Sequence, residues 1–374
     1  MAKIIISVTN DLLTDQRVHK VCASLQEVGY DLLLIGRRFH DSKPLERSYP
    51  TRRMRLIFNS SFLFYVEYNF RLFFYLLFSK ADLFLSNDTD SLLANYLAAT
   101  IRNKPLVFDA HEMFPEVPEL TNRPFVKSVW TAIENCIFPK LKYAYTVCQS
   151  IADIYNKKYN INMQVVRNIP LACPAEGSEI ICKIKNAQAI NKKEGEYVLL
   201  YQGAINVGRG IEWMIEAMPF LDNFVFYIAG TGDKMQEMQA LVREKKLQHR
   251  VIFLGRIPLE QLSEYTACAD IGISFLENKG LNYYYSLPNR IFDFMRAQVP
   301  VIASDFPEIS AVIKKYELGI LIDHYEPQYI ASVIKEMIKI PFDEQKYSIA
   351  NSELSWENES KTILQMVEKA LTLN

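Results

Sequence analysis

The chain has 374 residues, which is enough for two domains of ordinary size. Apolar residues make up 49% and charged residues 23%, a composition that predicts full cores and argues against extended disorder. The formal net charge of -1 argues against a general nucleic-acid-binding protein. Six scattered cysteines without a C-x-x-C pair indicate reduced thiols in a cytoplasmic protein, and we expect no signal peptide because the chain enters a strand at once.

The first half opens with a β-α-β pattern. Residues 3–8 are a continuous apolar run, which predicts a parallel strand covered on both faces, and a helix over 15–27 follows. No G-x-G-x-x-G is present, so the loop after the strand is free to bind something other than a dinucleotide. Asp15 and Arg17 lie there as candidate acceptor-binding residues. Alternatively, Asp15 is a helix N-cap and Arg17 a surface charge.

Residues 60–80 are unusually aromatic and predict a helix. Its length is near that of a membrane span, but Glu67 and Arg71 lie in the middle, where a charge costs roughly 2.5–3.5 kcal/mol. At i,i+4 these two are expected to pair on one face. The helix is either buried in the first domain or lies partly in a membrane interface. Basic clusters at residues 37–38 and 52–55 favour the interface, because anionic lipid attracts such patches.

Two strands of this half end in polar junctions. Asp88-Thr89-Asp90, after a strand over 81–86, resembles a D-x-D metal site, but Asp and Thr at a strand-to-helix junction are first of all capping residues.

Asp109, His111 and Glu112 follow a strand over 105–109, where ligands bind in open α/β sheets. A histidine beside carboxylates suits a proton carrier or a hydrogen-bond donor to a sugar, so these three are the candidate catalytic residues. The alternative is a satisfied loop histidine.

The α/β pattern restarts after a linker over residues 171–195. Strands are predicted at 197–201, 224–229, 251–254, 269–274, 301–303 and 318–322, and helices at 326–340 and 355–372. The first of these strands runs into a glycine-rich turn with Gly203, Arg209 and Gly210. Glycines let a backbone approach a phosphate closely, and the arginine brings the countercharge.

Residues 285–304 read as a loop, a short helix, a turn and a buried strand. Pro288 suits a helix entry, and the free N–H groups and dipole of that entry suit a phosphate. Asp293, one turn further on, is placed to accept hydrogen bonds from sugar hydroxyls. An ordinary helix between two loops is the alternative.

Together these segments resemble the glycosyltransferases of the GT-B architecture, and most of all family 4. The resemblance rests on residues 286–304, on Gly203, Arg209-Gly210 and Gly230-Thr231-Gly232 upstream, and on residues 14–17 and 109–112 in the first half. It implies an α/β fold of two Rossmann-like domains facing across a cleft, over residues 1–170 and 196–355. A C-terminal helix over 356–374 is expected to cross back to the first domain.

The resemblance also implies a nucleotide-diphosphate sugar as donor, retention at the anomeric carbon, and no metal or other cofactor. The implied donor-binding residues are Gly203, Arg209, Gly210, Gly230, Gly232, Arg256, Glu277, Ser286, Leu287, Pro288, Asn289, Arg290 and Asp293. His111 matches the histidine that hydrogen-bonds the donor sugar.

Two positions depart from the family pattern. Tyr285 stands where the first of two glutamates eight positions apart is expected, and Glu277 is a candidate substitute. Ala204 or Ile205 occupies the place of the first basic residue for the diphosphate, with Arg290 as a candidate replacement.

We therefore expect a transferase that moves a hexose-type sugar to a glycan or lipid-linked glycan, in the cytoplasm or on the inner face of the plasma membrane. The alternatives are a nucleotide-sugar epimerase of the same fold and an inactive nucleotide-sugar-binding protein.

Overall fold

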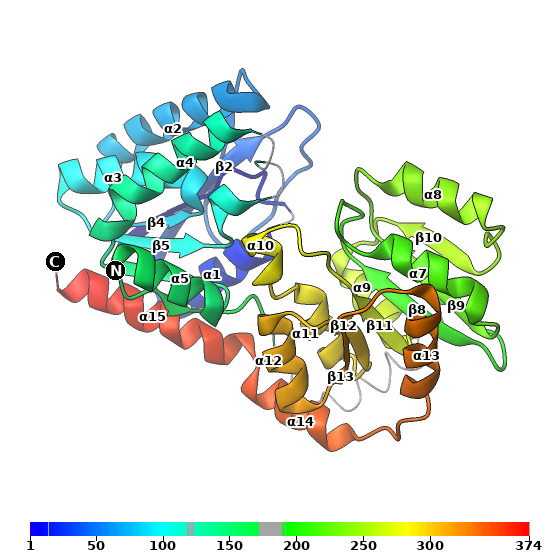
Figure 1. The fold of residues 1–374 in the computed structure, drawn as a ribbon. Helices are drawn as coiled ribbons and strands as arrows, with labels where there is room; N and C mark the ends of the chain where they lie inside the picture. Colours follow the sequence, from blue (N-terminus) through cyan, green and yellow to red (C-terminus); the bar gives the residue numbers. More distant parts are fainter. Residues whose placement is uncertain (14, 118–119, 121–122, 172–188, 191, 374) are drawn as a thin grey trace. The chain divides into compact units, whose positions relative to one another are not determined.

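The computed structural model describes residues 1–374 except 14, 118–119, 121–122, 172–188, 191 and 374 (Figure 1). The chain divides into two compact units. Unit 1 contains Met1–Asn168 and Trp356–Asn374, and unit 2 contains Ile169–Ser355. Most of the expected linker, 171–195, lies outside the described residues.

Unit 1 is built on a parallel sheet in the order β3-β2-β1-β4-β5-β6-β7. The apolar runs predicted from the sequence form its centre, with β1 paired to both β2 and β4. The strands are β1 (Lys3–Ser7), β2 (Asp31–Arg38), β3 (Thr51–Arg55), β4 (Leu83–Asn87), β5 (Leu106–Ala110), β6 (Tyr143–Thr146) and β7 (Gln164–Val165).

Helices cover both faces of this sheet, so its strands are buried from two sides (Figure 1). One core lies beneath α1 and α15, and the other beneath α2 and α3. The helices are α1 (Gln16–Glu27), α2 (Ser61–Phe78), α3 (Thr89–Arg102), α4 (Pro124–Ile137), α5 (Gln149–Tyr159) and α15 (Trp356–Thr372).

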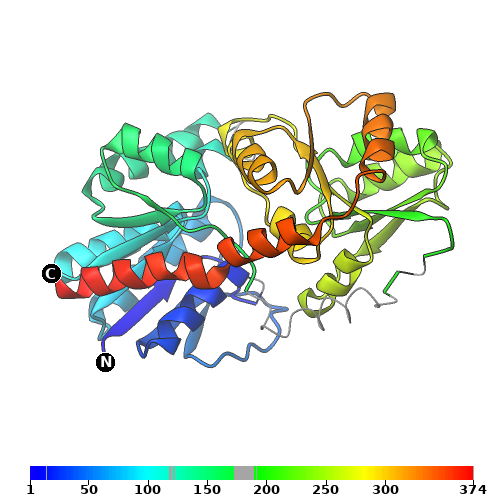
Figure 2. The same ribbon diagram turned by 90° about the horizontal axis from the view of Figure 1, so that it is seen from below.

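The C-terminal helix α15 belongs to unit 1, where it packs on α1 and β5 (Figure 2). Trp356 is buried at its start, and its indole Nε1 donates to Ser24 Oγ at 2.9 Å. Glu359 accepts hydrogen bonds from the Arg167 backbone N–H and guanidinium at 2.7 and 3.0 Å. These contacts hold the C-terminal helix on unit 1, so its expected return to the first domain is confirmed.

Unit 2 repeats the plan with a parallel sheet in the order β10-β9-β8-β11-β12-β13. Its strands are β8 (Tyr197–Gln202), β9 (Phe224–Ala229), β10 (Val251–Gly255), β11 (Ile271–Ser274), β12 (Val301–Ser304) and β13 (Gly319–Ile322). Its helices are α7 (Ile211–Ala217), α8 (Met235–Glu244), α9 (Leu259–Ala267), α10 (Leu281–Tyr284), α11 (Asn289–Arg296), α12 (Pro307–Tyr316), α13 (Pro327–Met337) and α14 (Glu344–Glu353).

Both sheets reverse their strand order once, between β1 and β4 and between β8 and β11. In open α/β sheets, ligands bind outside the carboxyl ends of the strands at such a reversal. In unit 1, β4 leads at this edge to the segment around residue 88, and the neighbouring β5 leads to the segment around residue 111. In unit 2 they lead to the glycine-rich turn at Gly203.

Candidate active site

In unit 1, the side chains of Asp88, Asp109 and His111 meet at the carboxyl ends of β4 and β5. Asp109 is the last but one residue of β5 and is fully buried. Asp88 follows β4 with a φ of 56°, a left-handed conformation that is strained for a residue other than glycine. Its backbone N–H donates to Asp109 O at 2.8 Å, which ties the two loops together.

Both ring nitrogens of His111 are engaged by carboxylates of unit 1. Nδ1 lies 3.1 Å from Asp88 Oδ2, and Nε2 lies 3.2 Å from Asp109 Oδ2 and 3.3 Å from Asn87 Oδ1. The backbone N–H of His111 also donates to Asp88 Oδ1, at 2.8 Å. The ring is therefore fixed in position, and doubly protonated imidazolium satisfies both carboxylates.

The electrostatics of this cluster hold His111 in its charged form. Burial alone lowers the pKa of its imidazole, but the neighbouring Asp88 and Asp109 carboxylates outweigh burial and raise it to about 10. Burial likewise acts to raise the pKa of Asp109, yet Arg17 and His111 hold it at about 2. A group with a pKa near 10 is a poor proton carrier at neutral pH, so His111 is better suited to act as a fixed positive charge.

Asp15 and Arg17, the expected acceptor-binding residues, are used inside unit 1. Asp15 is the N-cap of α1, accepting from the Val18 N–H at 2.9 Å, as its alternative interpretation predicted. Arg17 is only 4% exposed, so its interpretation as a surface charge is wrong. Its guanidinium forms a bidentate pair with Asp109 and donates to Val166 O at 2.8 Å. These contacts hold the carboxyl end of β5 in place and leave Arg17 facing inward.

The Asp88-Thr89-Asp90 junction does not behave as a simple cap. The Asp88 side chain makes no capping hydrogen bond to α3 and turns to His111 instead, which corrects the expectation of capping chemistry there. Asp90 accepts from Thr9 Oγ1 at 2.5 Å. Within the described part of the chain, no group of three or more His, Cys, Asp or Glu side chains is arranged to hold a metal ion.

In unit 2, the turns after β8 and β9 interlock at two glycines. A Cβ on Gly230, whose φ is 154°, would lie 1.8 Å from Gly203 O, and one on Gly232 would lie 2.4 Å from Ile205 O. The Ile205 N–H donates to Thr231 O at 3.0 Å across the same contact. Only glycine permits this approach, so the predicted glycine-rich turn has a packing reason as well as its expected phosphate-binding role.

Two guanidinium groups lie beside this turn. Arg290, on α11, lies over the Tyr201 ring with its Cζ 4.4 Å from the ring centroid, and a Cβ on Gly203 would be 3.8 Å from the same Cζ. The Cζ atom of Arg209 lies 4.9 Å from the centroid of the Tyr283 ring. Burial first, and then the positive charge of Arg209, lowers the pKa of Arg290.

These two arginines form a concentration of positive charge. Neither has a carboxylate ion-pair partner within 4.0 Å among the described residues. Arg209 Nε and Arg290 Nη1 are buried and make no hydrogen bond to the described protein. Two adjacent guanidinium groups with unused donors form a site suited to a multivalent anion.

Asp293 lies one turn into α11, whose N-cap is Pro288. Its Oδ2 accepts from Gln202 Nε2 at 2.8 Å, and Gln202 Oε1 accepts from Thr266 Oγ1 at 2.8 Å. These two hydrogen bonds hold the Asp293 carboxylate beside the glycine-rich turn. Ser286 Oγ donates to Tyr283 O at 2.9 Å, which shapes the loop before the helix, where Leu287 is half-buried and Asn289 exposed.

A family model described as Glycosyltransferase Family 4 matches residues 15–172, and one described as Glycosyl transferases group 1 matches residues 196–339. The chain belongs to the glycosyltransferases. The expected GT-B fold is confirmed, with one Rossmann-like unit in each matched region.

Individual relatives of this glycosyltransferase are distant. An uncharacterized glycosyltransferase of Methanocaldococcus jannaschii, MJ1607, is 25% identical over 202 residues, 51% of this chain and 50% of that protein. The match thus spans about half the length of the curated relative.

Solved structures share the fold of the glycosyltransferase over its whole length. Sucrose-phosphate synthase from Thermosynechococcus elongatus has a TM-score of 0.81 at 16% identity, with 100% of both chains covered. Anabaena HepE in complex with UDP-glucose has a TM-score of 0.70 at 15% identity, with 99% of this chain and 100% of that chain covered.

The remaining donor-side candidates of this glycosyltransferase also lie in unit 2. Glu277 is 39% exposed and pairs with Lys279 at 3.1 Å, and both line a small cavity of about 180 Å³ with Asn206 and Gly208. The Tyr285 ring packs edge-on against Tyr284, with centroids 5.0 Å apart. Arg256 is exposed after β10, and Gly210 is the N-cap of α7.

Several residues of the site were not predicted from the sequence. Asn87 and Asp88 contact His111, and Gln202 and Tyr201 contact Asp293 and Arg290. Tyr201 and Gln202 end the strand β8, so their position before the glycine-rich turn was an available signal. Asp88 also follows the end of a strand, but its contact with His111, 23 residues away, depends on the fold.

Proposed function

We propose that this protein transfers a hexose-type sugar from a nucleotide-diphosphate donor to a glycan or lipid-linked glycan. The observation that carries the proposal is the pair Arg209 and Arg290, two guanidinium groups with buried, unused donors beside an interlocked glycine turn. A diphosphate supplies the charge and the acceptor oxygens that this pair needs. HepE, a structural relative, is described in complex with UDP and with UDP-glucose, which supports a nucleotide-sugar donor here.

The diphosphate is assigned to Arg209, Arg290 and backbone N–H groups at the start of α11, because the N–H groups of Gly203 and Ser286 already donate to Ala229 O and Tyr283 O. Asp293 is assigned to the ribose hydroxyls, because its carboxylate is held by Gln202 near the turn. Glu277 is assigned to the transferred sugar in place of the family's first glutamate. We propose that no metal or other cofactor is needed, since the two guanidinium groups supply the countercharge that a cation would bring.

The reaction we propose is a retaining transfer. The bond from the anomeric carbon to the diphosphate oxygen breaks and the diphosphate leaves with the electron pair. The acceptor hydroxyl oxygen bonds to that carbon on the same face, and its proton passes to a diphosphate oxygen. Fixed positive charge stabilises the leaving group, so no strong base is required. His111 contributes as an imidazolium, and Asp109 and Asp88 hold it there.

The acceptor is assigned to unit 1, and the exposed aromatic side chains of α2 favour a lipid-linked one, as in the assembly of surface polysaccharides. On this proposal the enzyme works in the cytoplasm, on the inner face of the plasma membrane. No described helix is long and apolar enough to span a bilayer. The epimerase alternative needs a free carboxylate base, and the bidentate pair between Asp109 and Arg17 makes Asp109 unsuited to that role.

A thermal-shift panel of nucleoside diphosphates and nucleotide sugars tests the donor site. A ligand at about 100 times its dissociation constant should stabilise the protein by about 2.7 kcal/mol. We expect one nucleotide class to stabilise the wild type, with the shift lost in Arg209→Ala and reduced in Asp293→Ala. Arg243→Ala, an exposed arginine in the last turn of α8, is the matched control and should keep the shift. If no nucleotide stabilises the wild type, the donor assignment fails.

A further inference from the structure

Helix α2 is apolar on its buried side and also on much of its exposed side. Phe64, Tyr68, Leu72 and Leu76, spaced by four residues, face the core of unit 1. On the other sides the exposed aromatic side chains are Phe62 (55%), Phe70 (64%), Phe74 (43%) and Phe78 (80%). A helix that is apolar all round is normally buried on every side, and α2 is covered on one side only by the described chain.

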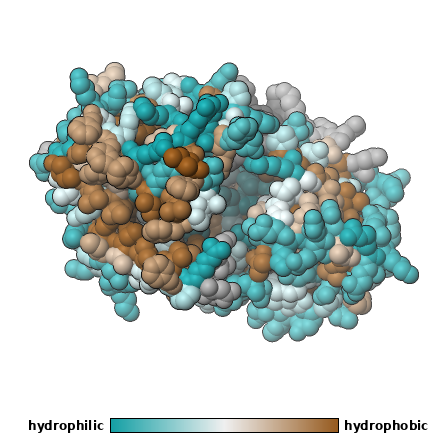
Figure 3. Space-filling model, turned by 90° about the horizontal axis from the view of Figure 1, so that it is seen from above, coloured by the Kyte–Doolittle hydropathy of each residue, from teal (hydrophilic) through white to brown (hydrophobic). Residues whose placement is uncertain are grey.

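The apolar surface continues beyond α2. Leu93, Leu97 and Ile101 are exposed on the neighbouring α3, at 37%, 42% and 63%. Viewed from the side on which α2 and α3 lie, unit 1 shows a broad gathering of hydrophobic side chains (Figure 3). Contiguous patches of this kind mark interaction sites on proteins, whereas single exposed apolar residues do not. We call the exposed side chains of α2 and α3 the apolar face.

Basic side chains border the apolar face. Arg52 is exposed and lies over the Tyr75 ring of α2 at 4.4 Å, and Arg71 pairs with Glu67 at 2.6 Å, confirming the i,i+4 pair predicted from the sequence. Arg55 is exposed on β3, and Lys80 is exposed just after α2. Lys80 has no ion-pair partner within 4.0 Å among the described residues. Aromatic rings with flanking lysine and arginine form the pattern of a helix that lies in a membrane interface.

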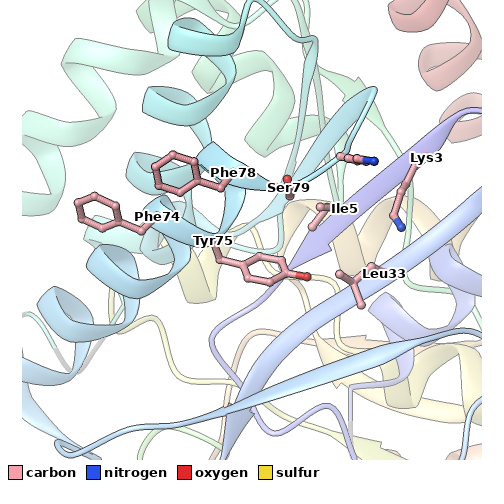
Figure 4. A pocket seen from close by; sticks show the side chains of 8 residues that line it. Lys3, Ile5, Leu33, Phe74, Tyr75, Phe78 and Ser79 are labelled. Atoms are coloured by element: carbon pink, nitrogen blue, oxygen red, sulfur yellow. The ribbon is translucent and has the colours of Figure 1, made fainter.

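A crevice of about 390 Å³ opens at the carboxyl end of α2 (Figure 4). Phe74, Tyr75 and Phe78 line it from the helix, and Ile5 and Leu33 from the sheet. Lys3 and Lys80 add two positive charges to its lining. The Lys3 side chain is 39% exposed, and its Nζ lies 3.5 Å from Asp31 Oδ2 at a similarly exposed position, so this ion pair is weak. A second carboxylate, Asp82, is occupied by the Lys3 backbone N–H at 2.9 Å. The crevice thus joins apolar walls to a cationic rim.

We propose that the apolar face rests on an anionic lipid bilayer and that the crevice takes one phosphate-bearing lipid, with its headgroup at Lys3 and Lys80. This deepens the proposed function and rests on it, because a lipid-linked acceptor lies in a bilayer. The crevice is at the amino ends of β1 and β2, away from the candidate active site at the carboxyl ends of β4 and β5, so its lipid anchors the protein and is distinct from the acceptor. The basic border decides for an anionic bilayer over a second copy of the chain, because two copies would bring like charges together. Anionic lipid, in contrast, complements Arg52, Arg55 and Lys80 directly.

Co-sedimentation of the full chain with vesicles tests this proposal without any substrate. Vesicles of phosphatidylcholine alone are compared with vesicles that also contain phosphatidylglycerol. We expect the wild type to pellet only with the anionic vesicles. The double change Phe70→Ser with Phe78→Ser should abolish pelleting, and Lys80→Glu should weaken it by at least about fivefold. Phe342→Ser and Lys245→Glu, at exposed sites of unit 2, are the matched controls and should pellet like the wild type.

Several outcomes would overturn the proposal. They are equal pelleting with uncharged vesicles, no pelleting at all, or a wild-type dimer in analytical ultracentrifugation that Phe70→Ser with Phe78→Ser dissociates. Two variants distinguish failure of this lipid proposal from failure of the proposed function. Arg209→Ala should lose nucleotide binding and still pellet, while Phe70→Ser with Phe78→Ser should lose pelleting and still bind the nucleotide.

Discussion

Arg17 and Asp109 form a buried bidentate ion pair, with Nη2 2.7 Å from Oδ1 and Nε 2.9 Å from Oδ2. The side chains are 4% and 0% exposed. The pair joins the start of α1 to the end of β5 across 92 residues of sequence. Asp109 in turn contacts His111, so Arg17 supports the candidate catalytic residue without facing a substrate.

Replacing Arg17 by Met should destabilise unit 1 strongly. The change leaves the Asp109 carboxylate buried with only His111 to compensate it, and breaking a buried pair in this way costs about 3–5 kcal/mol. The free energy of unfolding in urea measures the loss. Lys314→Met is the control, because its pair with Asp305 is exposed and should contribute about 0.5 kcal/mol or less. A further Asp109→Leu change should recover part of the stability, and an Arg17→Met protein as stable as the wild type would contradict this account.

The raised pKa of His111 predicts a pH-dependent contribution to stability. Its folded pKa of about 10 lies above the ordinary value of 6.5, because Asp88 and Asp109 outweigh the effect of burial. Burial raises the pKa of Asp88 to about 8, so it is the contribution of the Asp109–His111 pair that is complete below about pH 6.5, and it is lost as the pH rises toward 10. The difference in unfolding free energy between the wild type and His111→Gln should shrink over this range. A difference that does not change between pH 6 and pH 10 would show that His111 is neutral in the folded protein.

The Asp88 carboxylate should matter for turnover more than for donor binding. In Asp88→Asn the charge opposite His111 Nδ1 is removed, so the pKa of His111 should fall and the pH profile of kcat should shift to lower pH. His111→Ala should lower kcat by about a hundredfold with an unchanged nucleotide dissociation constant, since the donor is assigned to unit 2. Kinetics and calorimetry on the same preparations measure both quantities. A loss of activity without a loss of binding would exclude the inactive alternative, and unchanged kcat would remove His111 from the mechanism.

The sequence predicted the parts of the fold whose signal is local. Continuous apolar runs identified the central strands, because a parallel strand that is covered on both faces consists almost entirely of apolar residues. β3 was missed, because Thr51–Arg55 is an edge strand with arginine at three positions and was interpreted as a basic cluster. α14 was missed because it buries only Tyr347 and Ala350 and has no apolar stripe.

The parts of the site that were not predicted depend on tertiary contacts. Asp88 is of a residue type that commonly caps helices, and its carboxylate contacts His111 only because residues 109–111 lie beside it in the fold. Arg17 is a charged residue that follows a polar loop, so its sequence suggests exposure, and its burial depends on the ion pair with Asp109. Local propensity is overruled in both cases by a partner that the sequence does not place.

The contact between Gly230 and Gly203 should be more sensitive to substitution than a glycine's backbone angle alone would suggest. In Gly230→Ala the new Cβ would lie 1.8 Å from Gly203 O, a backbone atom fixed by the hydrogen bond from Gly203 N–H to Ala229 O. One turn must move, so the free energy of unfolding should fall by about 3 kcal/mol or more, and nucleotide binding should weaken.

Gly255→Ala is the matched control, because its φ is also positive, at 69°, but no atom lies within 4 Å of the new Cβ. It should cost about 1–2 kcal/mol and leave binding unchanged. Urea unfolding and calorimetry with the nucleotide found in the thermal-shift panel separate the two effects. Equal losses in the two variants would mean that backbone strain alone, and not the interlock of the two turns, sets the requirement for glycine at position 230.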